Sequence, residues 1–170
     1  MKRMLAAFLL LATTLTAAPN PVTTVILVRH AERASQEKDS PLSAAGEARA
    51  QELARVLAGV KIDAIYTTQY LRTKDTAAPL AAAFKIVPVA RDAGDTYVAD
   101  IAKHIRAAHT GQTVVVVGHS NTTLEVMQAL GATDLPPSIP DGQFDDLFVL
   151  TDAGGSAPRV VALRYGVPTR

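Results

Sequence analysis

Residues 22–30 read VTTVILVRH, a β-branched apolar run that ends in an arginine and a histidine. A short run with no polar residue after Thr24 is typical of a strand that is buried on both faces. Such strands belong to parallel sheets that helices cover on both sides, and ligand sites of these sheets gather at the carboxyl ends of the strands. Arg29 and His30 stand at such an end, so we expect them to be functional.

Strand-like and helix-like patterns alternate along the rest of the chain. After Ser43, apolar residues recur at helical spacing up to Leu57, and charged residues, among them Arg49, occupy the other face. The sequence predicts further strands at 64–66, 86–89, 113–117, 147–151 and 159–164, and further helices at about 70–84, 98–105 and 121–131. This order predicts one three-layer α/β/α domain, residues 19–170, with a mostly parallel central sheet and a C-terminal antiparallel hairpin.

The first 18 residues have the layout of a signal peptide. Lys2 and Arg3 precede an apolar run at 4–15, and small residues follow at 16–18. The run is shorter than the roughly 20 residues that a membrane-spanning helix needs. We therefore expect cleavage near residue 18, export to the periplasm or the medium, and no stable membrane anchor in the mature protein.

Composition narrows the classes of partner. The chain has 170 residues, a formal net charge of +1, 48% hydrophobic residues and no cysteine. Basic residues are scattered along the chain and form no basic cluster that would bind nucleic acid, so the sequence predicts no nucleic-acid partner. The absence of cysteine rules out a disulfide framework.

Polar residues follow the predicted strands at more than one point. Arg29 and His30 end the first strand, Arg72 lies at the start of the helix after the second, and His119 follows the strand at 113–117. Guanidinium groups bind phosphate oxygens in pairs of hydrogen bonds, and imidazole titrates near neutral pH. The pattern therefore favours a small phosphorylated substrate.

The segments that carry these residues resemble the histidine phosphatase superfamily, which includes cofactor-dependent phosphoglycerate mutases and small phosphohistidine phosphatases. LVRHAER at 27–33 is similar to the signature motif of that family, and PLSAAGEARAQELA at 41–54 to its next helix. DAIYTTQYLRTKDTAAPLA at 63–81 and VVVVGHSNT at 114–122 resemble the segments with the second arginine and the second histidine.

The resemblance implies a role for each matched residue. His30 would attack phosphorus, and Arg29, Arg72 and His119 would bind the phosphate oxygens, with neither a metal nor another cofactor. Family members take a proton donor from the loop after the third strand, where Asp95 is our candidate and Asp92 the alternative. Glu32 matches the glutamate of the signature, and we expect it to support the site by orienting Arg29 or Arg33.

The sequence leaves several functions open beside metal-independent phosphomonoester hydrolysis. They are a protein phosphohistidine phosphatase and a noncatalytic phosphate-binding protein of the same fold. A serine hydrolase fits poorly, because Thr122 replaces the last glycine of the elbow motif begun by Gly118–His119–Ser120 and no histidine follows His119. A metal hydrolase that uses His30, Glu32 and His119 also fits poorly, because the sequence has no His-Glu-x-x-His pair on a helix. Mutase activity is disfavoured because the chain has little inserted sequence to shield a phosphohistidine from water.

Overall fold

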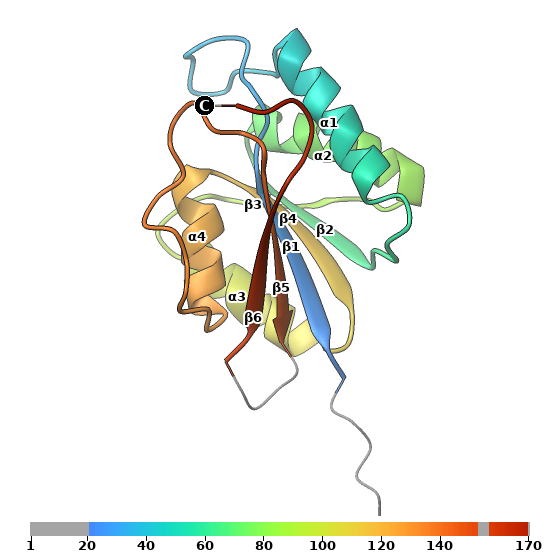
Figure 1. Ribbon diagram of the computed structural model, residues 1–170, viewed down its shortest axis with the longest axis vertical. Helices are drawn as coiled ribbons and strands as arrows, with labels where there is room; N and C mark the ends of the chain where they lie inside the picture. The colour runs from blue at the N-terminus through green and yellow to red at the C-terminus, as the bar shows by residue number, and fades with distance from the viewer. Residues whose placement is uncertain (1–20, 153–156, 170) are drawn as a thin grey trace, which may run out of the picture.

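A computed structural model describes residues 21–152 and 157–169 (Figure 1). The predicted signal segment, residues 1–18, and the glycine turn expected near residue 154 lie outside these ranges. No helix within these ranges is long and apolar enough to cross a membrane. The elements follow one another as β1 (Thr23–Arg29), α1 (Ala44–Val56), β2 (Ala64–Thr68), α2 (Leu71–Phe84), β3 (Val89–Arg91), α3 (Tyr97–Ala108), β4 (Thr113–Gly118), α4 (Ser120–Ala129), β5 (Asp146–Asp152) and β6 (Arg159–Arg164).

The described strands form one six-stranded sheet in the order β3-β2-β4-β1-β5-β6. β1 to β4 run parallel, β5 is antiparallel to β1, and β6 is antiparallel to β5. This confirms the mostly parallel sheet and the C-terminal antiparallel pair. In the register of β1 and β4, Arg29 lies opposite Gly118, so the residues that follow these strands, His30 and His119, leave the sheet at one level.

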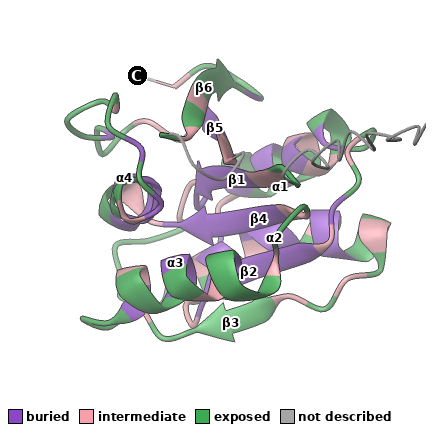
Figure 2. Cartoon of the chain, turned by 90° about the horizontal axis from the view of Figure 1, so that it is seen from below, coloured by how far each residue is buried: buried purple, intermediate pink, exposed green. Residues whose placement is uncertain are grey.

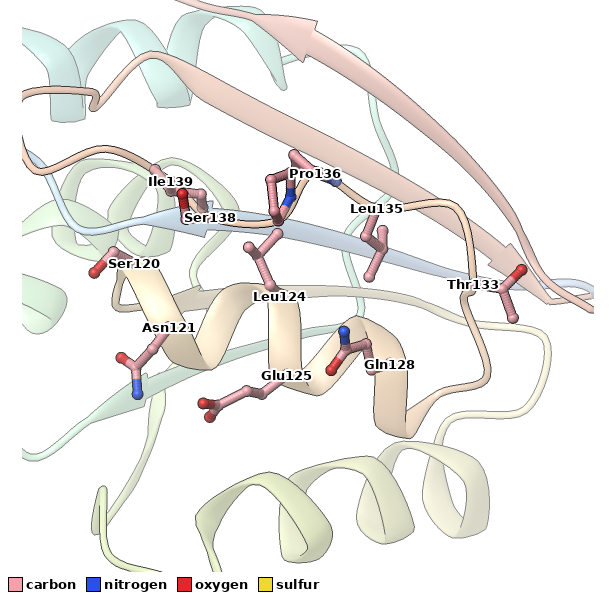
Figure 3. Close-up of a pocket in the computed structure, with 11 residues that line it drawn as sticks. Ser120, Asn121, Leu124, Glu125, Gln128, Thr133, Leu135, Pro136, Ser138 and Ile139 are labelled. Carbon is pink, nitrogen blue, oxygen red and sulfur yellow. The ribbon is translucent and has the colours of Figure 1, made fainter.

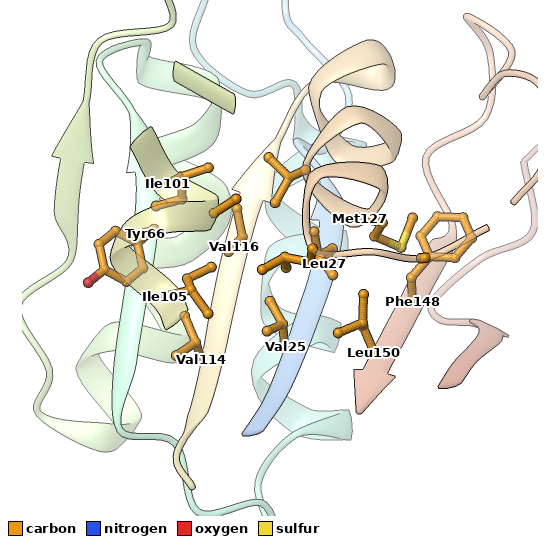
Figure 4. Packing of buried hydrophobic residues seen from close by; sticks show 14 of the residues in the cluster. Val25, Leu27, Tyr66, Ile101, Ile105, Val114, Val116, Met127, Phe148 and Leu150 are labelled. Atoms are coloured by element: carbon orange, nitrogen blue, oxygen red, sulfur yellow. The ribbon is translucent and has the colours of Figure 1, made fainter. Parts of the chain in front are cut away.

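Helices cover both faces of the sheet, as Figure 2 shows. α1 and α2 pack together on one face, where Ile26, Val28 and Val115 contribute to the core. α3 and α4 cover the other face, where Leu27 and Val116 pack beneath them (Figure 4). Alternate residues of each strand thus pack into the cores on opposite faces of the sheet. This explains why β1 and β4 are apolar along most of their length.

The third strand differs from the prediction: it spans Val89–Arg91 and not 86–89. Lys85 ends α2 in a left-handed conformation, and the amide of Ile86 still donates to the carbonyl of Ala81. Ile86, the first residue of the predicted strand, therefore belongs to the end of the helix. Pro88 has no amide hydrogen for the ladder. The strand begins after it, as an exposed edge strand.

Gly46 allows α1 to lie directly against the loop that follows β1. A Cβ atom at this position would stand 2.3 Å from the carbonyl oxygen of Glu32, which is backbone and already accepts a hydrogen bond from the amide of Ser43. Ser43 in turn caps the helix by accepting a hydrogen bond from the amide of Gly46. The close approach fixes the position of the loop relative to α1.

Gly46→Ala is therefore expected to destabilise the protein by about 2 kcal/mol or more, since the loop or the helix must move. In an unobstructed helix the same substitution stabilises by about 1 kcal/mol, so the sign of the effect is diagnostic. Gly59→Ala is the matched control, because a Cβ there meets nothing within 4 Å. Urea unfolding of both variants measures the difference, and a stabilised Gly46→Ala would contradict the close contact.

Candidate active site

His30 lies at the carboxyl end of β1 with its side chain buried and its orientation fixed by the backbone. Its amide donates to the carbonyl of Gly118 at 2.9 Å, which extends the pairing of β1 with β4. Its ring Nδ1 lies 2.8 Å from the carbonyl oxygen of Ala31. A carbonyl oxygen only accepts, so Nδ1 carries the hydrogen and Nε2 keeps a free lone pair. His30 therefore has the tautomer that a nucleophilic Nε2 requires.

His119 follows β4 and faces His30, with 5.4 Å between the ring centroids. The Nη2 of Arg72 lies 3.3 Å from its Nδ1, and Thr68 Oγ1 lies 3.1 Å from its Nε2. Arginine only donates, so Nδ1 accepts and Nε2 carries the hydrogen, which it donates to Thr68. Neutral His119 thus has the opposite tautomer to His30.

Arg29 is held by a loop from the C-terminal third of the chain. Its Nη1 donates to the carbonyl oxygens of Pro140 at 2.8 Å and Gln143 at 3.0 Å. Its guanidinium carbon stands 4.3 Å from the centre of the Phe144 ring, which also lies near the ring of His30. Among the described residues, its buried Nε has no hydrogen-bond partner. An anion beside His30 would supply that acceptor.

Arg72 is held in a similar way at the start of α2. Its Nη1 donates to the carbonyl oxygen of Lys38 at 2.7 Å, and its guanidinium carbon stands 4.3 Å from the centre of the Tyr70 ring. Its Nε, like that of Arg29, is buried without a partner in the described part of the chain. Each arginine is thus stacked on an aromatic ring and retains an unsatisfied donor, which prepares both for a shared anion.

Burial and the neighbouring cations keep both histidines neutral. Desolvation lowers the pKa of His30 to about 3, and the charges of His119, Arg29 and Arg72 act in the same direction. Desolvation also lowers the pKa of His119 to about 4, with further contributions from Arg72, Arg29 and Arg33. A neutral His30 at physiological pH has the lone pair available for attack.

These shifts predict a loss of stability in mild acid. Below pH 6.5 an unfolded chain binds protons at both histidines, whereas the folded protein does not until its much lower pKa values are reached. The free energy of unfolding should therefore fall between pH 6.5 and pH 5, by about 1 to 2 kcal/mol for each histidine. Urea unfolding at several pH values measures it. His30→Asn should reduce the fall, and an unchanged pH dependence in that variant would contradict the shifted pKa.

Glu32 does not orient Arg29 or Arg33 as expected but pairs with Arg49 of α1. The guanidinium Nη2 of Arg49 lies 2.8 Å from Glu32 Oε1, and the Arg49 side chain is only 3% exposed. Arg49 also donates to the carbonyl oxygens of Tyr165 and Val167 at 2.9 and 2.8 Å. Arg49 was expected on the solvent face of the helix, and that prediction is wrong because the C-terminal tail covers it. Arg49 of α1 therefore links the loop after β1, through Glu32, to the C-terminal residues Tyr165 and Val167.

Asp95 and Asp92, the candidate proton donors, are exposed in the loop between β3 and α3. Neither makes a described hydrogen bond or ion pair with the histidines and arginines of the site, so the role of Asp95 stays a prediction. Asp92 instead lines a separate 300 Å³ pocket with Tyr97 and His104. The carboxylate that acts most strongly on Arg29 belongs to Asp141, which the sequence did not single out.

Two hollows adjoin the cluster of histidines and arginines. A cavity of about 490 Å³ is lined by Arg29, Arg33, Asp141 and Phe144, among others. A groove of about 350 Å³ begins at Ser120, the residue after His119, and runs between α4 and the loop at 135–139, which contains Pro136 and Pro137, as Figure 3 shows. Either could receive the organic half of a substrate. Within the described ranges, no three His, Cys, Asp or Glu side chains gather so that they could hold a metal ion.

The structure brings His30, His119, Arg29 and Arg72 together, as the sequence predicted. It adds Tyr70, Phe144, Thr68 and the carbonyls of the 140–143 loop, which hold these groups in place. The site thus combines two neutral imidazoles with two arginines whose Nε donors lack partners among the described residues, a set of groups chemically suited to a tetrahedral oxyanion.

Comparisons with known proteins agree with this class of site. Residues 25–94, which include Arg29, His30 and Arg72, match the family model of the histidine phosphatase superfamily (branch 1). No curated protein shows a significant sequence match. The chain is thus similar to the histidine phosphatase superfamily over the part that carries three of the four residues of the site.

Several solved structures share the fold. One is a mycobacterial glucosyl-3-phosphoglycerate phosphatase, with a TM-score of 0.63 and 16% identity over 85% of this chain and 100% of that one. Another, assigned as the phosphohistidine phosphatase SixA of Agrobacterium tumefaciens, has a TM-score of 0.60 and 26% identity over 89% of this chain and 100% of that one. A third, the protein histidine phosphatase SixA complexed with tungstate, has a TM-score of 0.66 and 17% identity over 83% and 96% of the two chains.

Proposed function

We propose that the protein is a phosphatase that hydrolyses small phosphomonoesters through a phosphohistidine on His30, without a metal ion. The observation that carries this proposal is the hydrogen bond from His30 Nδ1 to the Ala31 carbonyl, which leaves Nε2 unprotonated beside two arginines. The named phosphatases of the same fold support it.

In the first step, the Nε2 lone pair of His30 attacks phosphorus, an N–P bond forms, and the bond to the leaving oxygen breaks, with that oxygen taking its proton from solvent. Arg29 and Arg72 bind the oxygens of the transferring group with their guanidinium donors, including the Nε groups that lack partners in the described structure. The hydrogen stays on Nδ1 and is donated to the carbonyl oxygen of Ala31, which stabilises the positive charge that develops on the ring. In the second step, water attacks phosphorus and gives up a proton to solvent, and the N–P bond breaks with its electron pair returning to Nε2, which releases phosphate and restores the neutral His30.

A protein phosphohistidine phosphatase is the second candidate, and the position of Asp95 favours it. Among the described residues, no carboxylate makes a hydrogen bond with either histidine, and Asp95 is exposed. Alkyl esters need a proton on the leaving oxygen, whereas an imidazole leaving group departs with less assistance. A site that lacks a fixed acid therefore suits activated leaving groups best.

The test is the rate of hydrolysis of three substrates by the purified protein, with and without chelator. They are p-nitrophenyl phosphate, an alkyl phosphate such as glycerol 3-phosphate, and a histidine-phosphorylated protein. Chelator-resistant turnover of the first two supports the monoesterase, and turnover of the aryl and phosphohistidine substrates alone supports the second candidate. Binding of inorganic phosphate with no turnover of any substrate would indicate a noncatalytic phosphate-binding protein.

We also propose that the protein is exported and acts in the periplasm or the medium. The support is the charged, apolar and small-residue order of residues 1–18. A hydrolase that needs no metal or nucleotide supplied by the cytoplasm is suited to that location. The mass of the protein recovered outside the cytoplasm would show whether the first 18 residues have been removed.

A further inference from the structure

A chain of hydroxyl groups leads from His119 into the protein interior. Thr68 Oγ1 lies 3.1 Å from His119 Nε2 and 2.9 Å from Thr73 Oγ1. Thr73 Oγ1 lies 2.9 Å from the carbonyl oxygen of Tyr70 and 3.2 Å from that of Thr68. The side chains of Thr68 and Thr73 are fully buried, so water does not reach the hydrogen bond between their hydroxyl groups.

The hydrogens of this chain can point in only one direction. Arg72 must donate to His119 Nδ1, so His119 Nε2 donates to Thr68. Thr68 has used a lone pair for that bond and gives its own hydrogen to Thr73, which passes its hydrogen to a backbone carbonyl. Because the last acceptor is a carbonyl, the order cannot reverse.

We propose that Thr68, supported by Thr73, is a positioning residue that holds the Nε2 hydrogen of His119 and thereby turns Nδ1 toward the phosphate. When a phosphate dianion binds, the Nη2 of Arg72 leaves His119 Nδ1 and donates to a phosphate oxygen instead. Nδ1 then takes up one proton from solvent and donates it as a hydrogen bond to a phosphate oxygen. The Nε2 hydrogen stays on the imidazolium and continues to be donated to the hydroxyl oxygen of Thr68. This inference rests on the proposed function, because it concerns the same phosphate site.

The charges around His119 make this acceptor important. The cations that face His119 are Arg72 from α2, Arg29 from β1 and Arg33 from the loop after β1. Each of them lowers the pKa of His119. The rings of His30 and Tyr70 also face it, at 5.4 and 5.6 Å between centroids, and among the described residues no carboxylate shifts its pKa. The bound dianion and the Thr68 oxygen are thus the groups that favour the protonated form of His119.

Thr68→Val tests the inference because it removes the hydroxyl and keeps the shape of the side chain. We expect kcat/KM for p-nitrophenyl phosphate at pH 7.5 to fall roughly 10- to 100-fold, as for the loss of a hydrogen bond to a charged group. The alkaline limb of the kcat–pH profile should move down by about one pH unit, since imidazolium loses its acceptor. Thr68→Ser should restore both. If Thr68 had only a structural role, Thr68→Val would lower the rate without moving the alkaline limb of the kcat–pH profile.

Thr67→Val is the matched control. Thr67 is the preceding residue of β2, equally buried, and its hydroxyl has no hydrogen-bond partner within the described ranges. Its replacement should leave both the rate and the pH profile unchanged. If Thr68→Val keeps the wild-type alkaline limb, or if Thr68→Ser is as impaired as Thr68→Val, the positioning role is wrong.

A spectroscopic measurement separates this inference from the proposed function. Nitrogen NMR of the ligand-free protein reports which ring nitrogen of His119 carries the hydrogen, and it needs no turnover. We expect hydrogen on Nε2 in the wild type and a shift toward Nδ1 in Thr68→Val. Hydrogen on Nδ1 in the wild type would overturn the inference even if the protein hydrolyses phosphate esters. Failure to bind inorganic phosphate or to hydrolyse any ester would instead contradict the proposed function.

Discussion

Replacing His30 with alanine is expected to abolish hydrolysis of p-nitrophenyl phosphate, with a loss of at least about 10⁴-fold in kcat. The reason is that the N–P bond of the intermediate can form only on His30 Nε2, which the Ala31 carbonyl leaves unprotonated. His119 is not expected to substitute, because its Nε2 carries the hydrogen donated to Thr68 and its Nδ1 is proposed to donate a hydrogen bond to the bound phosphate. The fold should survive, since the His30 amide still pairs with Gly118.

Labelling by phosphorylated substrate provides the direct measurement. The wild-type protein should retain a label after denaturation at alkaline pH, where the acid-labile N–P bond persists, and His30→Ala should retain none. His104→Ala is the control, because His104 belongs to α3 and lies against Tyr66 and His109 instead of in the site. Normal turnover by His30→Ala, or an equal label on it, would show that another group receives the phosphoryl group.

Arg49→Ala is expected to destabilise the protein by about 3 kcal/mol. It leaves Glu32 without its partner in a site where the two side chains are only 3% and 18% exposed, and breaking such buried pairs is costly. It also removes the donors to the carbonyls of Tyr165 and Val167, so the tail loses its attachment to α1.

The same helix offers a matched control for that variant. Arg55 pairs with Glu52 at the same distance of 2.8 Å, but the two side chains are 70% and 37% exposed. Arg55→Ala should change the free energy of unfolding by no more than about 0.5 kcal/mol, because solvent screens such pairs. Urea unfolding of both variants measures the contrast. Similar losses for Arg49→Ala and Arg55→Ala would mean that the burial of the Glu32 pair contributes little.

The fold and the central residues of the site were predictable because short-range patterns encode them. Buried strands such as β1 are recognisable from their continuous apolar residues, and a parallel sheet brings the residues after its strands to one edge. Arg29, His30 and His119 could therefore be placed beside one another from the sequence. Arg72 was found because it lies just inside the helix that follows β2.

The supporting contacts could not be predicted because they join distant parts of the chain. Helical periodicity assigns every charged residue to the solvent face, and it fails for Arg49 because residues 165–167 cover that face. Phe144 and the carbonyls around it carry no sequence signal, since any residue provides a carbonyl. The position of Asp95 depends on the path of its loop, which spacing does not determine.

The attachment of Arg29 to the carbonyls of Pro140 and Gln143 has a consequence for biosynthesis. The residues proposed to react with phosphate have all been synthesised once the ribosome passes His119. Arg29 is nevertheless held by backbone 111 and 114 residues further along the chain. A nascent chain therefore has the chemical groups of the site before it has their arrangement. Competence to bind phosphate should arise only when the last third of the chain docks.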